Sequence, residues 1–87
     1  MAIEITLIGR NGCHLCEVAQ GHLAQVIARF ASEFPNVEYS IDDVDIDQNP
    51  QFSHFTDEVP VLLINGQQVS FWRIDQDRVF AKLGELA

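Results

Sequence analysis

The sequence has few basic residues, no long apolar run and only two cysteines among its 87 residues. Thirteen acidic residues against five lysines and arginines leave a formal charge of −8, which repels phosphate backbones and anionic lipid head groups. Apolar runs such as the one at residues 59–64 fall far short of the about 20 residues that cross a bilayer. We therefore expect no nucleic-acid partner, no membrane partner and no transmembrane helix.

The N-terminus also lacks a basic segment followed by an apolar stretch and a small-residue cleavage site, so we expect a mature, cytoplasmic chain. No internal repeat or low-complexity tract interrupts the sequence. Hydrophobic residues make up 47% of the chain, which is enough apolar surface to offset the entropy of folding. The length suits one hydrophobic core and is too short for two, so residues 1–87 are predicted to form a single, monomeric domain.

The two cysteines are spaced as a pair in the motif Cys13-His14-Leu15-Cys16. A disulfide between them would close a very small loop and would constrain little of the unfolded chain, so a purely structural bridge is disfavoured. In a reducing compartment, the C-x-x-C spacing indicates redox exchange or metal binding.

Alternating apolar and polar residues predict strands at residues 2–8 and 37–42. Between them, apolar residues from Leu15 onward recur in steps of three and four and predict a helix of about twenty residues, which begins at or next to Cys13 and ends before Pro35. A strand, a helix and a second strand in succession predict a parallel pair joined by a right-handed crossover. Cys13 then lies at the carboxyl end of the first strand, where open α/β sheets generally carry their chemistry.

The second half of the chain predicts a short helix, a hairpin and a final helix. Asn49-Pro50 suits the cap and first turn of the short helix, after a solvated polar connection at residues 43–48. Asn65-Gly66 tolerates the positive φ angles of a tight turn between antiparallel strands, and Asp75 can cap the last helix. The predicted order is β-α-β-α-β-β-α, an α/β domain with a four-stranded mixed sheet and helices on both faces.

The chemistry of the cysteine pair depends on forming a thiolate, because a free cysteine with a pKa of about 8.5 is mostly protonated at neutral pH. The N-terminus of a helix supplies unpaired N–H groups and partial positive charge that lower the pKa of a thiol, and Cys13 is predicted at that end. Arg10 and a protonated His14 would add to this effect. Cys16, one helical turn along, is placed to attack a mixed disulfide formed on Cys13. Cys13 is the predicted nucleophile and Cys16 the predicted resolving thiol.

Metal binding is the main alternative use of the same two thiols. A structural zinc site needs four ligands, and His14, His22 and His54 lack the paired spacing of a zinc finger, so no metal site is predicted. Two thiolates suit Cu(I), which leaves a copper chaperone open, although those domains run β-α-β-β-α-β and end on a strand. A redox-inert interaction domain on the same fold is the third interpretation.

Taken together, these motifs resemble the glutaredoxin-like branch of the thioredoxin fold over essentially the whole chain. The resemblance rests on Gly-Arg-Asn-Gly-Cys-His-Leu-Cys at residues 9–16, and on Glu58-Val59-Pro60-Val61 before the Asn-Gly hairpin. It implies a cis peptide bond before Pro60, with Pro60 facing the cysteine pair and the backbone of Val59 offered to a substrate strand. It also implies that Arg10 helps to bind glutathione.

The chain departs from the glutaredoxin pattern at several positions. His14 stands where a proline usually follows the first cysteine, and Glu58 stands where a threonine is usual. The Gly-Gly segment before the aspartate that receives the γ-glutamyl carboxylate is replaced, so that only Asp75 matches. Phe71 and Trp72, which take part in this replacement, are interpreted as core or rim residues.

The sequence therefore predicts a thiol-disulfide oxidoreductase that uses Cys13 and Cys16 and needs no cofactor. Glutathione is a candidate co-substrate whose use is predicted to be poor, since Glu58 repels its carboxylates and the missing glycines remove a close backbone approach. The substrate is expected to be a protein disulfide or a low-molecular-weight thiol.

Overall fold

The structure is a computed structural model, and it describes residues 2–87. Four strands form one mixed sheet in the order β2-β1-β3-β4. The strands are β1 (Ile3–Gly9), β2 (Tyr39–Asp45), β3 (Val61–Ile64) and β4 (Gln67–Phe71). The helices are α1 (His14–Glu33), α2 (Gln76–Leu86) and two 3-10 helices, η1 (Ile46–Gln48) and η2 (Pro50–Phe55). The predicted element order is confirmed, with a 3-10 helix in place of the short second α-helix.

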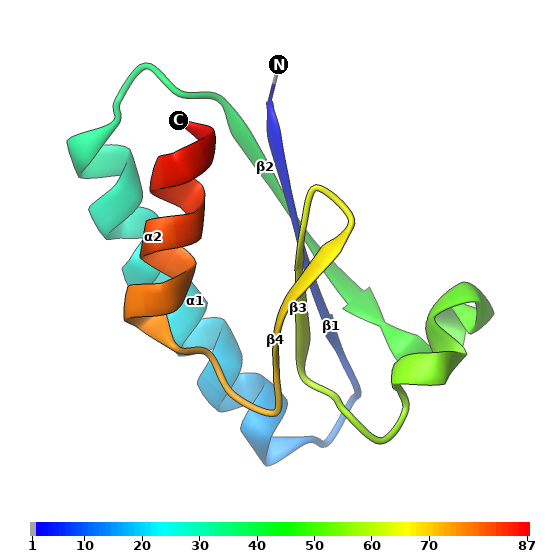
Figure 1. The fold of residues 1–87 in the computed structure, drawn as a ribbon. Coiled ribbons are helices and arrows are strands. Elements are labelled where there is room, and N and C mark those ends of the chain that lie inside the picture. The colour runs from blue at the N-terminus through cyan, green and yellow to red at the C-terminus, as the bar shows by residue number, and fades with distance from the viewer. Residues whose placement is uncertain (1) are drawn as a thin grey trace.

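The strand β1 lies in the middle of the sheet and fixes its topology. It pairs in parallel with β2, to which α1 connects it as the crossover helix, and it pairs antiparallel with β3. In Figure 1, α1 and α2 lie on one side of the sheet, and the segment with η1 and η2 lies on the other. The loop from β1 into α1 is at the end of the molecule opposite to both termini.

Side chains from alternate positions of β1 contribute to two hydrophobic clusters, one on each face of the sheet. Ile5 and Leu7 pack with α1 and α2 in the larger cluster, in which Phe30 is fully buried. Ile8 points to the other face and packs with residues of η1 and β3. Phe52 and Phe55 of η2 cover this smaller cluster. The alternation predicted for the first strand therefore anchors both layers of the domain.

The strand β2 differs from its predicted bounds. It begins two residues later than predicted and continues to Asp45, so that residues 43–45 are strand and not a solvated connection. The register explains the difference, because β1 runs on to Gly9, which pairs with Asp45. As an edge strand, β2 can keep exposed aspartates such as Asp42 and Asp43 while its backbone bonds to β1.

The predicted turn and both predicted capping positions are confirmed. Asn65 and Gly66 both have positive φ, at 52° and 81°, as the tight turn requires. The Asp75 carboxylate accepts a hydrogen bond from the Arg78 N–H at the start of α2. Asn49 is the capping residue of η2 and Pro50 is its first residue, as predicted, but the Asn49 side chain makes no capping bond and donates to the Asp45 carbonyl at 2.8 Å. Neither α-helix in the described part of the chain has the length and apolar character needed to cross a bilayer.

Candidate active site

The cysteine pair lies at the N-terminus of α1, where Cys13 is the capping residue. Its backbone is extended, with φ of −93° and ψ of 112°, and its Sγ accepts a hydrogen bond from the Cys16 N–H at 3.2 Å. The Cys13 carbonyl accepts from the Glu17 N–H, also at 3.2 Å, and so begins the helix. Cys13 and Cys16 form a disulfide with their Cα atoms 5.2 Å apart. The predicted placement of the pair at the helix start is confirmed.

The two sulfur-bearing residues differ in their access to solvent. Cys13 is half-buried, whereas Cys16 is only 5% exposed. Cys16 packs so closely on the end of β1 that a Cβ added at Gly9 would lie 3.2 Å from both its Cβ and its Sγ. An approaching reagent therefore reaches the sulfur of Cys13 more readily than that of Cys16.

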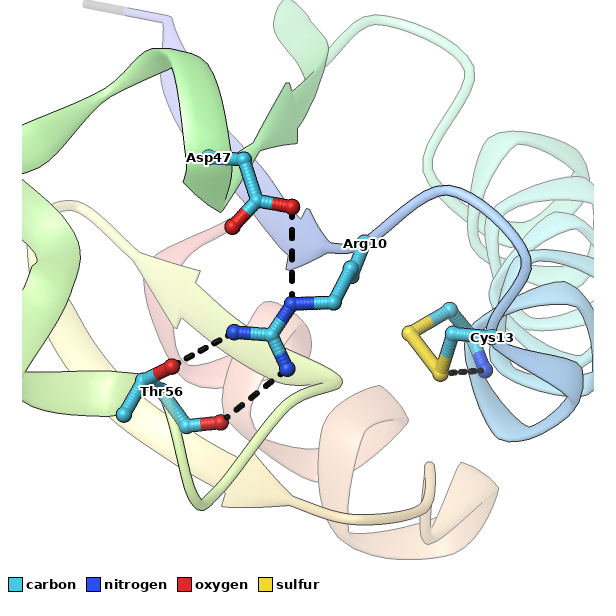
Figure 2. The surroundings of a disulfide bond; sticks show 5 residues. Arg10, Cys13, Asp47 and Thr56 are labelled. Carbon is cyan, nitrogen blue, oxygen red and sulfur yellow. Dashed lines mark hydrogen bonds and ion pairs between the residues drawn. A yellow bond between two sulfur atoms is a disulfide. The ribbon is translucent and has the colours of Figure 1, made fainter.

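The side chain of Arg10 is directed away from the disulfide, as Figure 2 shows. Its guanidinium donates from Nη2 to the Thr56 Oγ1, and from Nη1 to the Thr56 carbonyl at 3.5 Å. Its Nε lies 3.6 Å from the Asp47 carboxylate. Arg10 thus connects the loop before the cysteines with the segment after η2. Sequence reasoning did not identify Asp47 or Thr56 as its partners, because both lie more than thirty residues away in the chain.

The segment before β3 comes close to the cysteine pair through the sheet register. Val61 pairs with Ile8, so the preceding Pro60 falls opposite Gly9, on which Cys16 packs. The peptide bond between Val59 and Pro60 is cis, as the resemblance implied. The structure therefore brings Val59 and Pro60 to the same end of the sheet as the disulfide.

An apolar rim borders the motif on the side of the loop after β4. We define it by Leu15, Phe71, Trp72 and Arg73, which line an open hollow of about 430 Å³. Leu15, Phe71 and Trp72 are 53%, 45% and 55% exposed. Leu15 therefore does not belong to the buried face of α1, where its spacing had placed it. Phe71 and Trp72 lie at the rim and not in the core.

The remaining predicted residues lie around this centre without converging on it. His14 is exposed at the first position of α1, and His54 is exposed and packs at a tilt against Phe55, with ring centroids 4.0 Å apart. Asp75 caps α2 and lines a second hollow with Arg73 and Arg78. Within residues 2–87, no three or more His, Cys, Asp and Glu side chains gather as a metal site would require.

Comparison with known proteins shows the family of this chain. Residues 4–84 match the family model described as Glutaredoxin-like domain (DUF836). The chain belongs to this glutaredoxin-like family. It is 32% identical over 85 residues to a glutaredoxin-like protein of Dictyostelium discoideum, and the match covers 94% of this chain and 76% of that protein.

Solved structures of similar chains agree with the fold. The X-ray structure of a structural-genomics target from X. campestris is 31% identical, with a TM-score of 0.68 over 93% of this chain and 96% of that one. Chloroplastic thioredoxin z shares the fold alone, at 18% identity and a TM-score of 0.68, covering 98% of this chain and 78% of that one. The predicted thioredoxin-like α/β fold is confirmed, and the chain closes on α2 and not on the strand expected of a copper chaperone.

Proposed function

We propose that this glutaredoxin-like protein is a thiol-disulfide oxidoreductase in which Cys13 attacks the substrate disulfide and Cys16 resolves the product. The observation that carries the proposal is the hydrogen bond from the Cys16 N–H to the Cys13 Sγ at the start of α1. In the reduced protein the same N–H would face a thiolate, and a hydrogen bond to the charged form favours that form. The helix N-terminus adds partial positive charge at the same end.

The reaction proceeds in two exchanges that conserve thiols and disulfides. The Cys13 thiolate attacks one sulfur of a substrate disulfide, forms a mixed disulfide and releases the other sulfur as a thiolate. Cys16, after losing its proton to solvent, then attacks the Cys13 Sγ, and the second substrate sulfur leaves as a thiolate. The two released thiolates take up protons according to the pH. The substrate gains two electrons, and the Cys13–Cys16 disulfide holds the oxidised form of the protein.

A protein disulfide fits this site better than glutathione. The rim offers Leu15, Phe71 and Trp72, whose apolar surface is suited to apolar side chains next to a substrate cysteine. Glutathione is a tripeptide with two carboxylates, and the half-buried Glu58 two residues before Pro60 would repel them. Arg10, which could have paired with a carboxylate, is already engaged by Asp47 and Thr56.

A trapping experiment tests the two roles. Reduced Cys16→Ser protein, mixed with a small disulfide-containing protein, should accumulate a mixed disulfide that peptide mass mapping assigns to Cys13. Reduced Cys13→Ser protein is the matched control and should accumulate little, because the remaining thiol is buried against Gly9. Trapping on Cys16 to an equal extent, or on neither residue, would refute the assignment.

A further inference from the structure

The segment of residues 56–60, which joins η2 to β3, is held from two sides by residues distant in the chain. On one side, Arg10 donates from its guanidinium to both the Oγ1 and the carbonyl of Thr56, and Asp47 lies 3.6 Å from its Nε (Figure 2). Arg10 belongs to the loop that leads to Cys13. The segment is thereby tied to the same loop that carries the cysteine pair.

On the other side, Trp72 makes three hydrogen bonds to this segment. Its backbone N–H donates to the Glu58 carbonyl at 3.1 Å and to the Pro60 carbonyl at 2.8 Å. Its indole Nε1–H donates to the Asp57 carbonyl at 2.9 Å. Trp72 has a φ of 66°, in the left-handed region that a bulky side chain seldom adopts. Such a conformation persists where the surroundings fix it, and here the three bonds do so.

Val59 lies between Glu58 and Pro60, whose carbonyls both accept from the Trp72 N–H. Neither its N–H nor its carbonyl takes part in a hydrogen bond within residues 2–87. The neighbouring Thr56 and Glu58 N–H groups, by contrast, donate to the carbonyls of Ser53 and Phe55. The contacts thus fix the segment while leaving one residue's donor and acceptor free for an incoming chain.

We propose that Arg10 and Trp72 are positioning residues for residues 56–60. They hold in place the Val59 backbone, which the glutaredoxin-like resemblance already implies is offered to a substrate strand. The proposal rests on the proposed function and assigns to Arg10 a role other than contact with glutathione. Loss of either positioning residue weakens docking of that strand and leaves the chemistry of Cys13 unchanged, because neither residue touches the sulfur.

Two substitutions each remove one hydrogen bond that holds the segment. Trp72→Phe removes the indole N–H that reaches Asp57, and because it also makes the ring at the rim smaller, it is compared by hydrogen exchange and not by reaction rate. Thr56→Val keeps the shape of the side chain and removes the Oγ1 acceptor of Arg10. Arg29→Lys is the matched control, since Arg29 forms its ion pairs with Glu33 of α1 and Asp77 of α2 and not with residues 56–60.

The measurement uses two probes that release the same coloured thiolate, thionitrobenzoate. Reduced protein is mixed with a ten-residue peptide whose single cysteine is a mixed disulfide with thionitrobenzoate, or with the mixed disulfide of thionitrobenzoate and 2-mercaptoethanol. Thr56→Val should react with the peptide about three- to tenfold more slowly, as expected for one lost hydrogen bond, and at an unchanged rate with the small probe. Arg29→Lys should leave both rates unchanged. An unchanged peptide rate in Thr56→Val, or an equal fall with both probes, would overturn the proposal.

Amide hydrogen exchange on the oxidised protein gives a second readout that needs no activity. The Glu58 and Val61 amides should exchange faster in Trp72→Phe and Thr56→Val than in the unsubstituted protein, because each variant lacks one hydrogen bond that holds the segment. Unchanged exchange in both variants would overturn the positioning role, whatever the exchange chemistry shows. Failure of the unsubstituted protein to react with either probe would instead refute the proposed function on which the docking role rests.

Discussion

Cys13 occupies the helix position at which a hydroxyl or a carboxylate usually accepts the free N–H groups of the first turn. A thiol is a weak acceptor, whereas a thiolate is a strong one. The cap of α1 is therefore stronger when Cys13 is ionised. This coupling between helix capping and ionisation is a property of one side chain, and it does not depend on the nearby arginine.

Gly9 is the residue that allows Cys16 to approach the sheet. We expect Gly9→Ala to lower the free energy of unfolding of the oxidised protein by about 1–3 kcal/mol, because the added Cβ would lie 3.2 Å from the Cβ and Sγ of Cys16. Urea unfolding of the two proteins measures the difference. Equal or higher stability of the variant would show that Cys16 can move away from β1 at no cost.

At the scale of elements, Gly21 in α1 provides the opposite case and the control for Gly9. Nothing lies within 4 Å of a Cβ added at Gly21, and its φ is not in the left-handed region. We expect Gly21→Ala to raise the free energy of unfolding by about 0.5–1 kcal/mol, because alanine loses less backbone entropy in a helix. Urea unfolding again gives the value, and a destabilised variant would contradict the packing described for α1.

The helix α2 depends on Asp75 for its first turn. We expect Asp75→Ala to cost about 1 kcal/mol of folding free energy through loss of the bond from the Arg78 N–H, whereas Asp75→Asn should retain most of it. Thermal or urea unfolding compares the three proteins. An alanine variant as stable as the unsubstituted protein would remove the structural explanation for this aspartate.

Most element positions could be predicted from the sequence, because they depend on local signals. The Asn65-Gly66 turn, the Asp75 cap and the start of α1 at Cys13 each follow from residues adjacent in the chain. The end of β2 could not be predicted in this way. It is set by the length of β1, and the repeated aspartates of residues 42–45 carry no apolar alternation.

The candidate site could be predicted only where it depends on local motifs. The cysteine pair and the cis bond before Pro60 followed from motifs and from the resemblance they carry. The bonds of Arg10 and Trp72 join segments that the sequence separates widely, and no periodic pattern indicates them. One signal was present, since a lone tryptophan stands where glutaredoxins have glycine, but its left-handed backbone appears only in the fold.

The whole molecule carries a formal net charge of −8. Arg10, Arg29 and Lys82 are engaged in ion pairs, whereas Arg73 of the rim forms none within residues 2–87. The acidic surface disfavours small anions, and the apolar rim favours a polypeptide. We expect the choice of electron donor to depend on these two properties together.

We expect a thioredoxin system to reduce the oxidised protein faster than reduced glutathione does, and no glutathione adduct on Cys13 to accumulate. Mass spectrometry of the Cys13–Cys16 peptide over time measures both reactions. Glu58→Gln should raise the rate of reduction by glutathione, because it removes a charge that repels carboxylates, while Glu38→Gln, at the residue before β2, serves as the control. Fast reduction by glutathione with an adduct on Cys13 would make the protein a working glutaredoxin. Reduction by neither donor would favour the metal-binding or redox-inert interpretations.

The central claim is that Cys13 is the reactive thiol of the pair, and alkylation against pH tests it most directly. The fully reduced protein is treated with iodoacetamide at a series of pH values, and the labelled cysteine is identified by peptide mass. The account predicts that Cys13 is labelled well below its ordinary pKa of about 8.5, with the rate rising with pH until the thiolate is fully formed, while buried Cys16 stays largely unlabelled. Equal labelling of the two residues, or labelling of Cys13 only above that pKa, would contradict it.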